Sequence, residues 1–218
     1  MNNTHTFNLK KFGKQLNEAE NVIIMLHGRG GDTEDLVHSL NNHLSLDGMA
    51  ILAPQATNHT WYPYSFMAPQ TQNEPWLSSA LNIIQQTVEI ALAGGKTTRN
   101  LFFLGFSQGA CLMLEYVAQH AATYKGIFAY TGGLIGDKIY PKNYAGNFHN
   151  TPVLLGCSDV DPHVPLQRVY ATENILKDRG AQVHLRVYPD MGHTINGDEI
   201  ELTNRILSGG QQGEEPIK

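Results

Sequence analysis

The amino-acid sequence predicts an α/β fold in which helices cover both faces of a mostly parallel central sheet. Short apolar segments alternate along the chain with longer segments of helical character, an order typical of parallel sheets. Several of the short segments are apolar throughout, as expected for strands that are buried on both faces. With 218 residues, of which 41% are hydrophobic and 16% charged, the chain is long enough to enclose a sizeable core. We therefore expect one domain over residues 1–218, with a flexible tail over about 209–218.

The first part of the chain contains two expected strands with a helix between them. Residues 22–26 are apolar, β-branched at first, and end at a glycine-rich segment, which indicates a buried strand. A helix over about 33–46 follows, with Asp32 or Thr33 as its N-cap, because both side chains can accept a hydrogen bond from the first turn. Residues 49–53 predict the second strand, which a proline ends.

A long loop and a long helix come next. Residues 54–74 contain many aromatic side chains but show no helical period, so we expect an irregular loop. The following helix begins at about Glu74 or Pro75 and runs to Ala93, where two glycines end it.

The second half of the chain repeats the alternation of strand and helix. A glycine- and asparagine-rich loop is expected at 131–150. The expected strands are 100–105, 126–130, 152–156 and 183–188, and the expected helices are 108–121, 165–179 and 195–207. Right-handed crossovers place the carboxyl ends of parallel strands on one edge of the sheet, and ligands bind at that edge in such folds.

Charge and composition argue against several classes of function. The net charge is −5 and the pI is about 6.0, and no basic cluster indicates binding to nucleic acid or anionic lipid. No segment has the length and hydrophobicity of a membrane span or of a signal peptide. Two cysteines, Cys111 and Cys157, are too few to staple a chain of this size, so we expect them to be reduced and the protein to be cytoplasmic. The oligomeric state, monomer or homodimer, stays open.

One motif carries the clearest functional signal. Gly105-Phe106-Ser107-Gln108-Gly109 lies directly after an expected strand and directly before an expected helix. A serine hydroxyl becomes a useful nucleophile when it is exposed and held next to a base. A tight turn between strand and helix exposes it, and the flanking positions then have no room for side chains. The motif in this context predicts that Ser107 is a nucleophile.

A nucleophilic serine needs a base and an orienting acid on the same edge of the sheet. His193 follows the last expected strand and is our candidate base, whereas His27, at the end of the first strand, is expected to be a hydrogen-bonded supporting residue. The acid is either Asp159 or Asp161, since both follow the strand at 152–156. Spacing favours Asp161, and Asp159 could instead brace the loop. The resulting order, Ser then Asp then His, is that of α/β-hydrolases.

The negative charge that develops on the attacked carbonyl needs two backbone N–H groups aimed at one point. Gln108 should supply the first, since it follows the nucleophile at a helix N-terminus. Arg29, in the glycine-rich turn after the first strand, should supply the second. That turn lacks the spacing of a phosphate-binding loop, and no cluster of His, Cys and Asp has the spacing of a metal site.

The aromatic residues of the 54–74 loop have two possible roles. Trp61, Tyr62, Tyr64 and Phe66 could line a substrate pocket, because long loops in compact domains are usually functional. They could equally fold back as a satellite of the core. We take Trp61, Tyr62 and Phe66, together with His163, as candidate substrate contacts.

Taken together, these residues resemble the phospholipase/carboxylesterase family of α/β-hydrolases, which includes acyl-protein thioesterases. The similar segments extend from about residue 22 to 207 and are Leu26-His27-Gly28-x-Gly30, the motif at 105–109, Gly132-Gly133-Leu134, Asp161-Pro162-x-Val164-Pro165 and Gly192-His193. The resemblance implies that Ser107, Asp161 and His193 form the catalytic triad and that Arg29 and Gln108 are the oxyanion donors.

The resemblance also implies the kind of substrate. The family acts on small-molecule carboxylic esters, thioesters or lysophospholipids and needs no cofactor. Its thioesterase members commonly have an apolar residue where this chain has Arg29, so we expect a short-chain or aromatic ester at least as readily as a lipidated protein. Two alternatives are a dienelactone-hydrolase-like enzyme, a group that uses a cysteine nucleophile, and a non-catalytic ligand-binding protein on the same scaffold.

Overall fold

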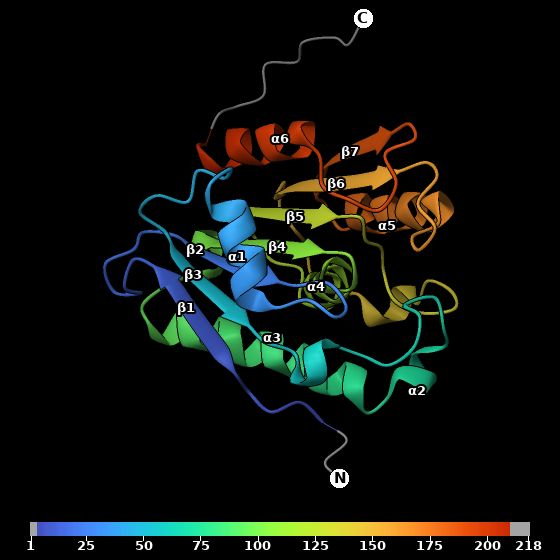
Figure 1. Ribbon diagram of the computed structural model, residues 1–218, viewed down its shortest axis with the longest axis horizontal. Helices are drawn as coiled ribbons and strands as arrows, with labels where there is room; N and C mark the ends of the chain where they lie inside the picture. The colour runs from blue at the N-terminus through green and yellow to red at the C-terminus, as the bar shows by residue number, and fades with distance from the viewer. Residues whose placement is uncertain (1–3, 210–218) are drawn as a thin grey trace, which may run out of the picture.

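The computed structural model describes residues 4–209 and contains one seven-stranded sheet, of order β1-β3-β2-β4-β5-β6-β7 (Figure 1). Strands β2 to β7 are parallel, and β1 pairs antiparallel with β3 at one edge. The predicted α/β class with a mostly parallel sheet is thus confirmed. The strands are β1 Leu9–Gly13, β2 Val22–Leu26, β3 Ala50–Pro54, β4 Leu101–Phe106, β5 Gly126–Tyr130, β6 Pro152–Ser158 and β7 Gln182–Tyr188. The helices are α1 Thr33–Asn41, α2 Gln70–Asn73, α3 Trp76–Ala93, α4 Gln108–Gln119, α5 Leu166–Asp178 and α6 Gly197–Leu207.

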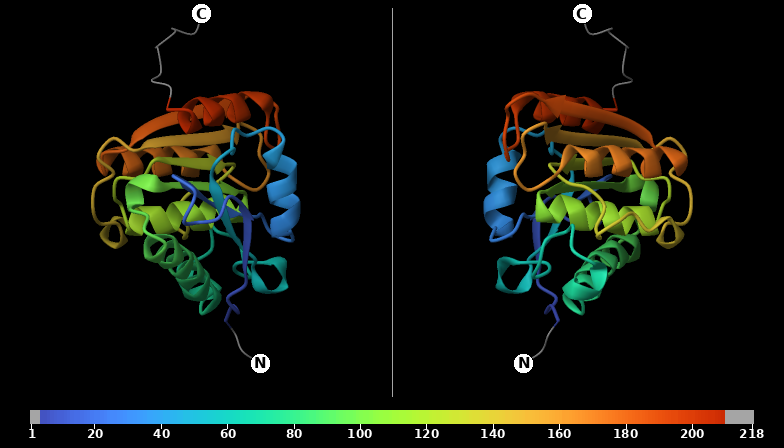
Figure 2. Two further views of the ribbon diagram at one scale, coloured as in Figure 1. Left: turned by 90° about the vertical axis from the view of Figure 1, so that its left-hand side faces the viewer. Right: turned by 90° about the vertical axis from the view of Figure 1, so that its right-hand side faces the viewer.

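Helices cover both faces of the sheet, as the fully apolar strands predict. Alternate residues of each central strand point to opposite faces, so Ile24 of β2 packs in the cluster under α3, α4 and α5, whereas Ile23 packs in the cluster under α1 and α6. Phe103 and Phe102 of β4 divide in the same way. The side views show α1 on one side of the sheet and α3 and α4 on the other (Figure 2).

The strand β1 is absent from the sequence-based expectation. Its sequence Leu-Lys-Lys-Phe-Gly has two adjacent lysines and is only partly buried, because an edge strand pairs on one side only and needs few apolar residues. Gly13 ends it with φ +72°, and a Cβ atom there would collide with the carbonyl oxygen of Met49.

Two other expectations differ from the structure in detail. Helix α1 ends at Asn41 rather than near residue 46, and Asp32 is its cap, accepting from the backbone N–H of Glu34 at 2.7 Å. The expected loop at 54–74 contains a 3₁₀ turn over Thr57–His59 and the short helix α2. The remaining boundaries agree within two residues. Of the expected tail at 209–218, residues 210–218 lie outside the described part of the chain.

The topology brings three loops to one edge of the sheet. Strands β4, β5, β6 and β7 are parallel neighbours in that order, so their carboxyl ends lie together. The segments after β4, β6 and β7 carry Ser107, Asp161 and His193, respectively. Residues that are far apart in the sequence therefore meet at this edge.

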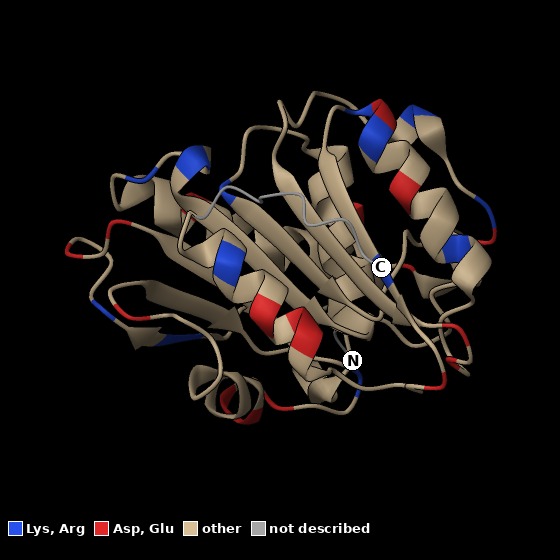
Figure 3. Cartoon of the chain, turned by 90° about the horizontal axis from the view of Figure 1, so that it is seen from above, with Lys and Arg blue, Asp and Glu red and all other residues tan. Residues whose placement is uncertain are grey.

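Charge and hydrophobicity of the described residues are unremarkable for a globular protein. Seen from above, Lys and Arg are interspersed with Asp and Glu over the helices and loops (Figure 3). Within residues 4–209 no helix has both the length and the hydrophobicity to cross a membrane. Cys111 and Cys157 are both buried and free.

Candidate active site

The serine of the Gly-x-Ser-x-Gly motif sits in a strained turn between β4 and α4. Ser107 has φ 54° and ψ −120°. Residues other than glycine rarely adopt this backbone conformation, so the surrounding structure must impose it. The flanking glycines make the turn possible. A Cβ atom on Gly105 would lie 2.7 Å from the backbone of Ala110, and one on Gly109 would collide with the carbonyl oxygen of Leu26.

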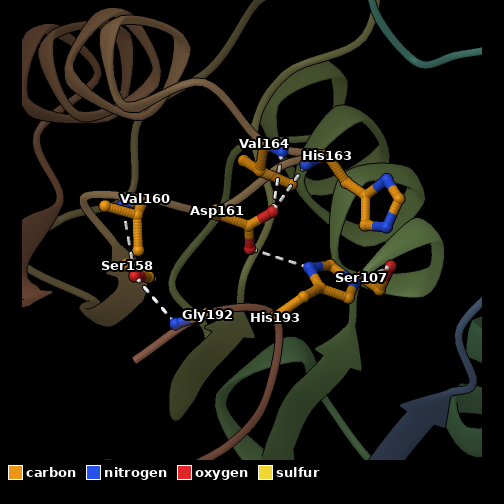
Figure 4. A network of polar contacts seen from close by, with 8 residues as sticks. All are labelled: Ser107, Ser158, Val160, Asp161, His163, Val164, Gly192 and His193. Atoms are coloured by element: carbon orange, nitrogen blue, oxygen red, sulfur yellow. Dashed lines mark hydrogen bonds and ion pairs between the residues drawn. The ribbon is translucent and has the colours of Figure 1, made fainter. Parts of the chain in front are cut away.

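Three side chains form a chain of hydrogen bonds that ends at this serine (Figure 4). His193 Nε2 lies 2.8 Å from Ser107 Oγ, and His193 Nδ1 lies 2.7 Å from Asp161 Oδ2. The carboxyl group of Asp161 is fully buried, whereas the imidazole of His193 is 20% exposed. The imidazole can therefore donate a hydrogen bond from its Nδ1–H to the carboxylate and present Nε2 to the serine, as a general base requires.

The buried carboxylate of Asp161 is held in place by its own loop. Its second oxygen, Oδ1, accepts hydrogen bonds from the backbone N–H groups of His163 at 2.7 Å and Val164 at 3.0 Å. These bonds to a charged acceptor are stronger than bonds between neutral groups. They fix Oδ2 toward His193.

Asp159, the other candidate acid, has a different place. Its Oδ1 accepts from the backbone N–H of Asp190 at 2.9 Å, in the loop that carries His193. Ser158 makes a similar contact that the sequence does not predict: its Oγ accepts from the backbone N–H of Gly192 at 3.0 Å (Figure 4). The loops after β6 and β7 are thereby tied to each other beside the Asp161–His193 hydrogen bond.

Within residues 4–209 the backbone N–H groups of the two expected oxyanion donors have no hydrogen-bond partner, as such donors require. Neither the N–H of Arg29 nor that of Gln108 donates to another group within residues 4–209. Gln108 is the first residue of α4, where unpaired N–H groups and the helix dipole favour negative charge. Gly28 brings the Arg29 turn close to the nucleophile, since a Cβ atom on Gly28 would lie 3.4 Å from Ser107 Cβ.

The side chain of Gln108 holds the aromatic loop against the nucleophile turn. Its Oε1 accepts from the backbone N–H of Trp61 at 3.0 Å, and its Nε2 donates to the carbonyl of Tyr62 at 2.8 Å. The indole Nε1 of Trp61 donates to the carbonyl of His27 at 2.8 Å. Trp61 is fully buried and does not line the cleft, so of its two possible roles the structure assigns it the core role and not that of a substrate contact.

His27 supports the same turn and is not in contact with the nucleophile. Its Nδ1 donates to the carbonyl of Gly28 at 2.7 Å, and its Nε2 accepts from the backbone N–H of Ala56 at 3.1 Å. Its ring stacks on Trp61 with the centroids 5.0 Å apart. Burial lowers the pKa of this imidazole, which favours the neutral ring that both hydrogen bonds require.

A cleft of about 480 Å³ opens over Ser107. The other candidate substrate contacts, Tyr62, Phe66 and His163, line it, and so does Tyr64. The ring of His163 lies 4.9 Å from that of His193 at nearly a right angle. Arg29 also lines the cleft, as do Phe106 and Cys111. Within residues 4–209 no group of three or more His, Cys, Asp or Glu side chains is placed to hold a metal ion.

Comparison with known proteins extends these observations. The sequence model of the phospholipase/carboxylesterase family matches residues 13–208. The crystal structure of a phospholipase/carboxylesterase from Dyadobacter fermentans superposes with a TM-score of 0.92 and 49% identity, covering 94% of this chain and 98% of that one. The fold is thus that of the α/β-hydrolases, as expected.

Two curated sequences show the range of names among the relatives. A probable carboxylesterase SOBER1-like of Arabidopsis thaliana is 23% identical over 205 residues, 87% of this chain and 78% of the relative. An acyl-protein thioesterase 1 of Kluyveromyces lactis is 25% identical over 220 residues, 92% of this chain and 96% of the relative.

Proposed function

The chain belongs to the phospholipase/carboxylesterase family, a family of carboxylesterase- and thioesterase-type hydrolases, and from this premise we propose that it is a serine hydrolase that cleaves carboxylic esters through an acyl-enzyme on Ser107. The observation that carries the proposal is the unbroken hydrogen-bond chain from Asp161 through His193 to a serine in a strained, cleft-facing turn. A thioester carbonyl would react by the same steps.

In the first half-reaction His193 Nε2 takes the proton of Ser107 as Oγ attacks the ester carbonyl. The tetrahedral intermediate collapses when His193 returns that proton to the leaving alcohol, and the acyl group stays on Oγ. In the second half, His193 takes a proton from a water that attacks the acyl-enzyme. The second tetrahedral intermediate collapses as the bond to Ser107 Oγ breaks and His193 returns that proton to Oγ, which releases the acid and restores Ser107. Asp161 holds the imidazole in the required tautomer and stabilises its protonated form throughout.

The oxyanion of both tetrahedral intermediates is held by the backbone N–H groups of Arg29 and Gln108. Neither N–H has another partner in the described part of the chain, so both can donate without breaking an existing hydrogen bond. Donors that are fixed before the reaction stabilise developing charge most effectively, and removing one such donor from an enzyme typically costs about 10²–10³ in kcat.

The test is hydrolysis of p-nitrophenyl esters with acyl chains of increasing length, by the wild type and by Ser107→Ala. We expect activity that the alanine variant loses by several orders of magnitude, because the members of a triad act as a unit. The chain-length optimum reports the depth of the cleft. Near-wild-type turnover by a folded Ser107→Ala protein would contradict the proposed nucleophile.

The cysteine-dependent alternative has a candidate thiol in the cleft, because Cys111 lies one helical turn after Ser107. Burial raises the pKa of this thiol to about 12, so it is neutral at physiological pH and a poor nucleophile. Ser107, not a cysteine, occupies the turn. A binding protein without activity is the remaining alternative, and it predicts no turnover of any ester in the series.

A further inference from the structure

The charge of the cleft is opposite to that of the whole chain. The net charge is −5, yet none of the described residues that line the cleft is Asp or Glu. Arg29 is the one residue among them with a permanent charge, and that charge is positive. A cleft lined by one sign of charge attracts ligands of the other sign.

The guanidinium of Arg29 is fixed at the cleft but not neutralised. Its Nη1 donates to the carbonyl of Pro63 at 3.0 Å and its Nη2 to the carbonyl of Tyr64 at 2.7 Å. The same group lies 5.9 Å from the centre of the Tyr62 ring. These partners are uncharged, and no carboxylate within residues 4–209 forms an ion pair with Arg29. An arginine has five N–H donors in a rigid fork, so donors remain for a ligand.

We propose that the preferred substrate is an ester whose acyl part also carries a carboxylate, which the guanidinium of Arg29 binds. The proposal rests on the ester hydrolysis proposed above. The backbone N–H of Arg29 is the expected donor to the reacting carbonyl, so the guanidinium lies within one arginine side chain of that carbonyl. The half-ester of a short dicarboxylic acid carries its carboxylate and its ester carbonyl within such a length of each other. The imidazole of His163, which also lines the cleft, offers a further N–H donor.

A purely structural role for Arg29 makes a different prediction. If its only role were to hold the carbonyls of Pro63 and Tyr64, replacing it would affect charged and neutral esters alike. The informative quantity is therefore the ratio of kcat/KM for a p-nitrophenyl hemiglutarate to that for its uncharged methyl ester, each corrected for uncatalysed hydrolysis. A displaced loop or a weakened oxyanion site would lower kcat/KM for both esters by the same factor, so the ratio of the two values would not change.

Four proteins are compared in this assay: the wild type, Arg29→Gln, Arg29→Lys and the control Arg99→Gln. Arg99 is exposed and precedes β4, at the opposite end of the strand from the cleft, so its loss changes net charge without touching the site. We expect the wild type and Arg99→Gln to show a kcat/KM roughly tenfold higher for the anionic ester, which is the discrimination that one hydrogen bond to a charged group can give. Arg29→Gln should lose this preference, and Arg29→Lys should retain part of it.

A wild-type ratio near one, or a ratio that Arg29→Gln leaves unchanged, would overturn the assignment of a carboxylate to this site. Failure of the proposed hydrolase activity has a different signature, because neither ester would then be turned over faster by the wild type than by Ser107→Ala. Raising the salt concentration should reduce the preference for the anionic ester, since salt screens the interaction of partly exposed charges.

Discussion

Glu199 carries a buried carboxyl group at the amino end of α6, and its ionisation should destabilise the fold. The side chain is fully buried. One oxygen accepts from the backbone N–H of Asn196 at 2.9 Å, whereas Oε1 has no hydrogen-bond partner within residues 4–209. The carboxyl group presses against β6 at Gly156, where a Cβ atom would collide with Oε1. Burial, and secondarily the charge of Asp198, raises the pKa of Glu199 from the usual 4.5 to about 7.

The direction and size of the change in unfolding free energy with pH follow from the difference in the pKa of Glu199 between the folded and unfolded states. Because the folded state holds the proton of Glu199 more tightly than the unfolded state does, stability falls as pH rises from about 4.5 to about 7. Each pKa unit corresponds to about 1.4 kcal/mol, so ionised Glu199 costs about 3 kcal/mol of unfolding free energy at pH 8. Glu199→Gln keeps an oxygen for the N–H of Asn196 but cannot ionise.

Urea denaturation of the wild type and of Glu199→Gln at several pH values between 4.5 and 8 measures this cost. Other buried groups, such as His27 with its lowered pKa, titrate in both proteins and cancel in the difference. We expect the variant to gain about 3 kcal/mol relative to the wild type across this range, with unchanged m-values. Parallel pH profiles for the two proteins would refute the burial of an ionisable carboxyl at this position.

Three substitutions test the geometry of the site. Gly109→Ala should destabilise the protein by about 3 kcal/mol or more in urea denaturation, since its methyl group would collide with the backbone carbonyl of Leu26; a fully stable variant would contradict the close approach of α4 to β2. Asp161→Asn should lower kcat for p-nitrophenyl esters by about 10³–10⁴ by favouring the wrong imidazole tautomer, whereas Asp159→Asn, which still accepts from the N–H of Asp190, should stay within severalfold of the wild type. Equal losses in the two asparagine variants would contradict the separate roles of the two aspartates.

Much of the fold could be predicted from the sequence because the segments with an apolar pattern are also the segments that are buried as strands. Residues 22–26 and 126–130 are apolar throughout and are buried strands with those bounds. The turn at Ser107 could be placed because glycines flank it between a strand and a helix. The parallel topology then implied that Asp161 and His193 lie at the same edge of the sheet.

The missed features depend on contacts between distant segments. The strand β1 has no apolar pattern of its own and exists because β3 offers an unpaired edge. Whether Trp61 faces the cleft or the core is decided by its hydrogen bonds to Gln108 and His27, which are 47 and 34 residues away. The contact between Glu199 and Gly156 joins α6 to β6 in the same way. Periodicity and spacing carry no signal for such pairs.

The central claim is that Ser107 is the nucleophile that His193 activates, and covalent labelling tests it most directly. The folded protein is treated with a fluorophosphonate, and the modified residue is located by peptide mass spectrometry alongside the loss of esterase activity. We expect one adduct per chain, on Ser107, with labelling abolished in Ser107→Ala and slowed by orders of magnitude in His193→Ala. No adduct in the folded wild type, or an adduct on another residue that accounts for the loss of activity, would contradict the account.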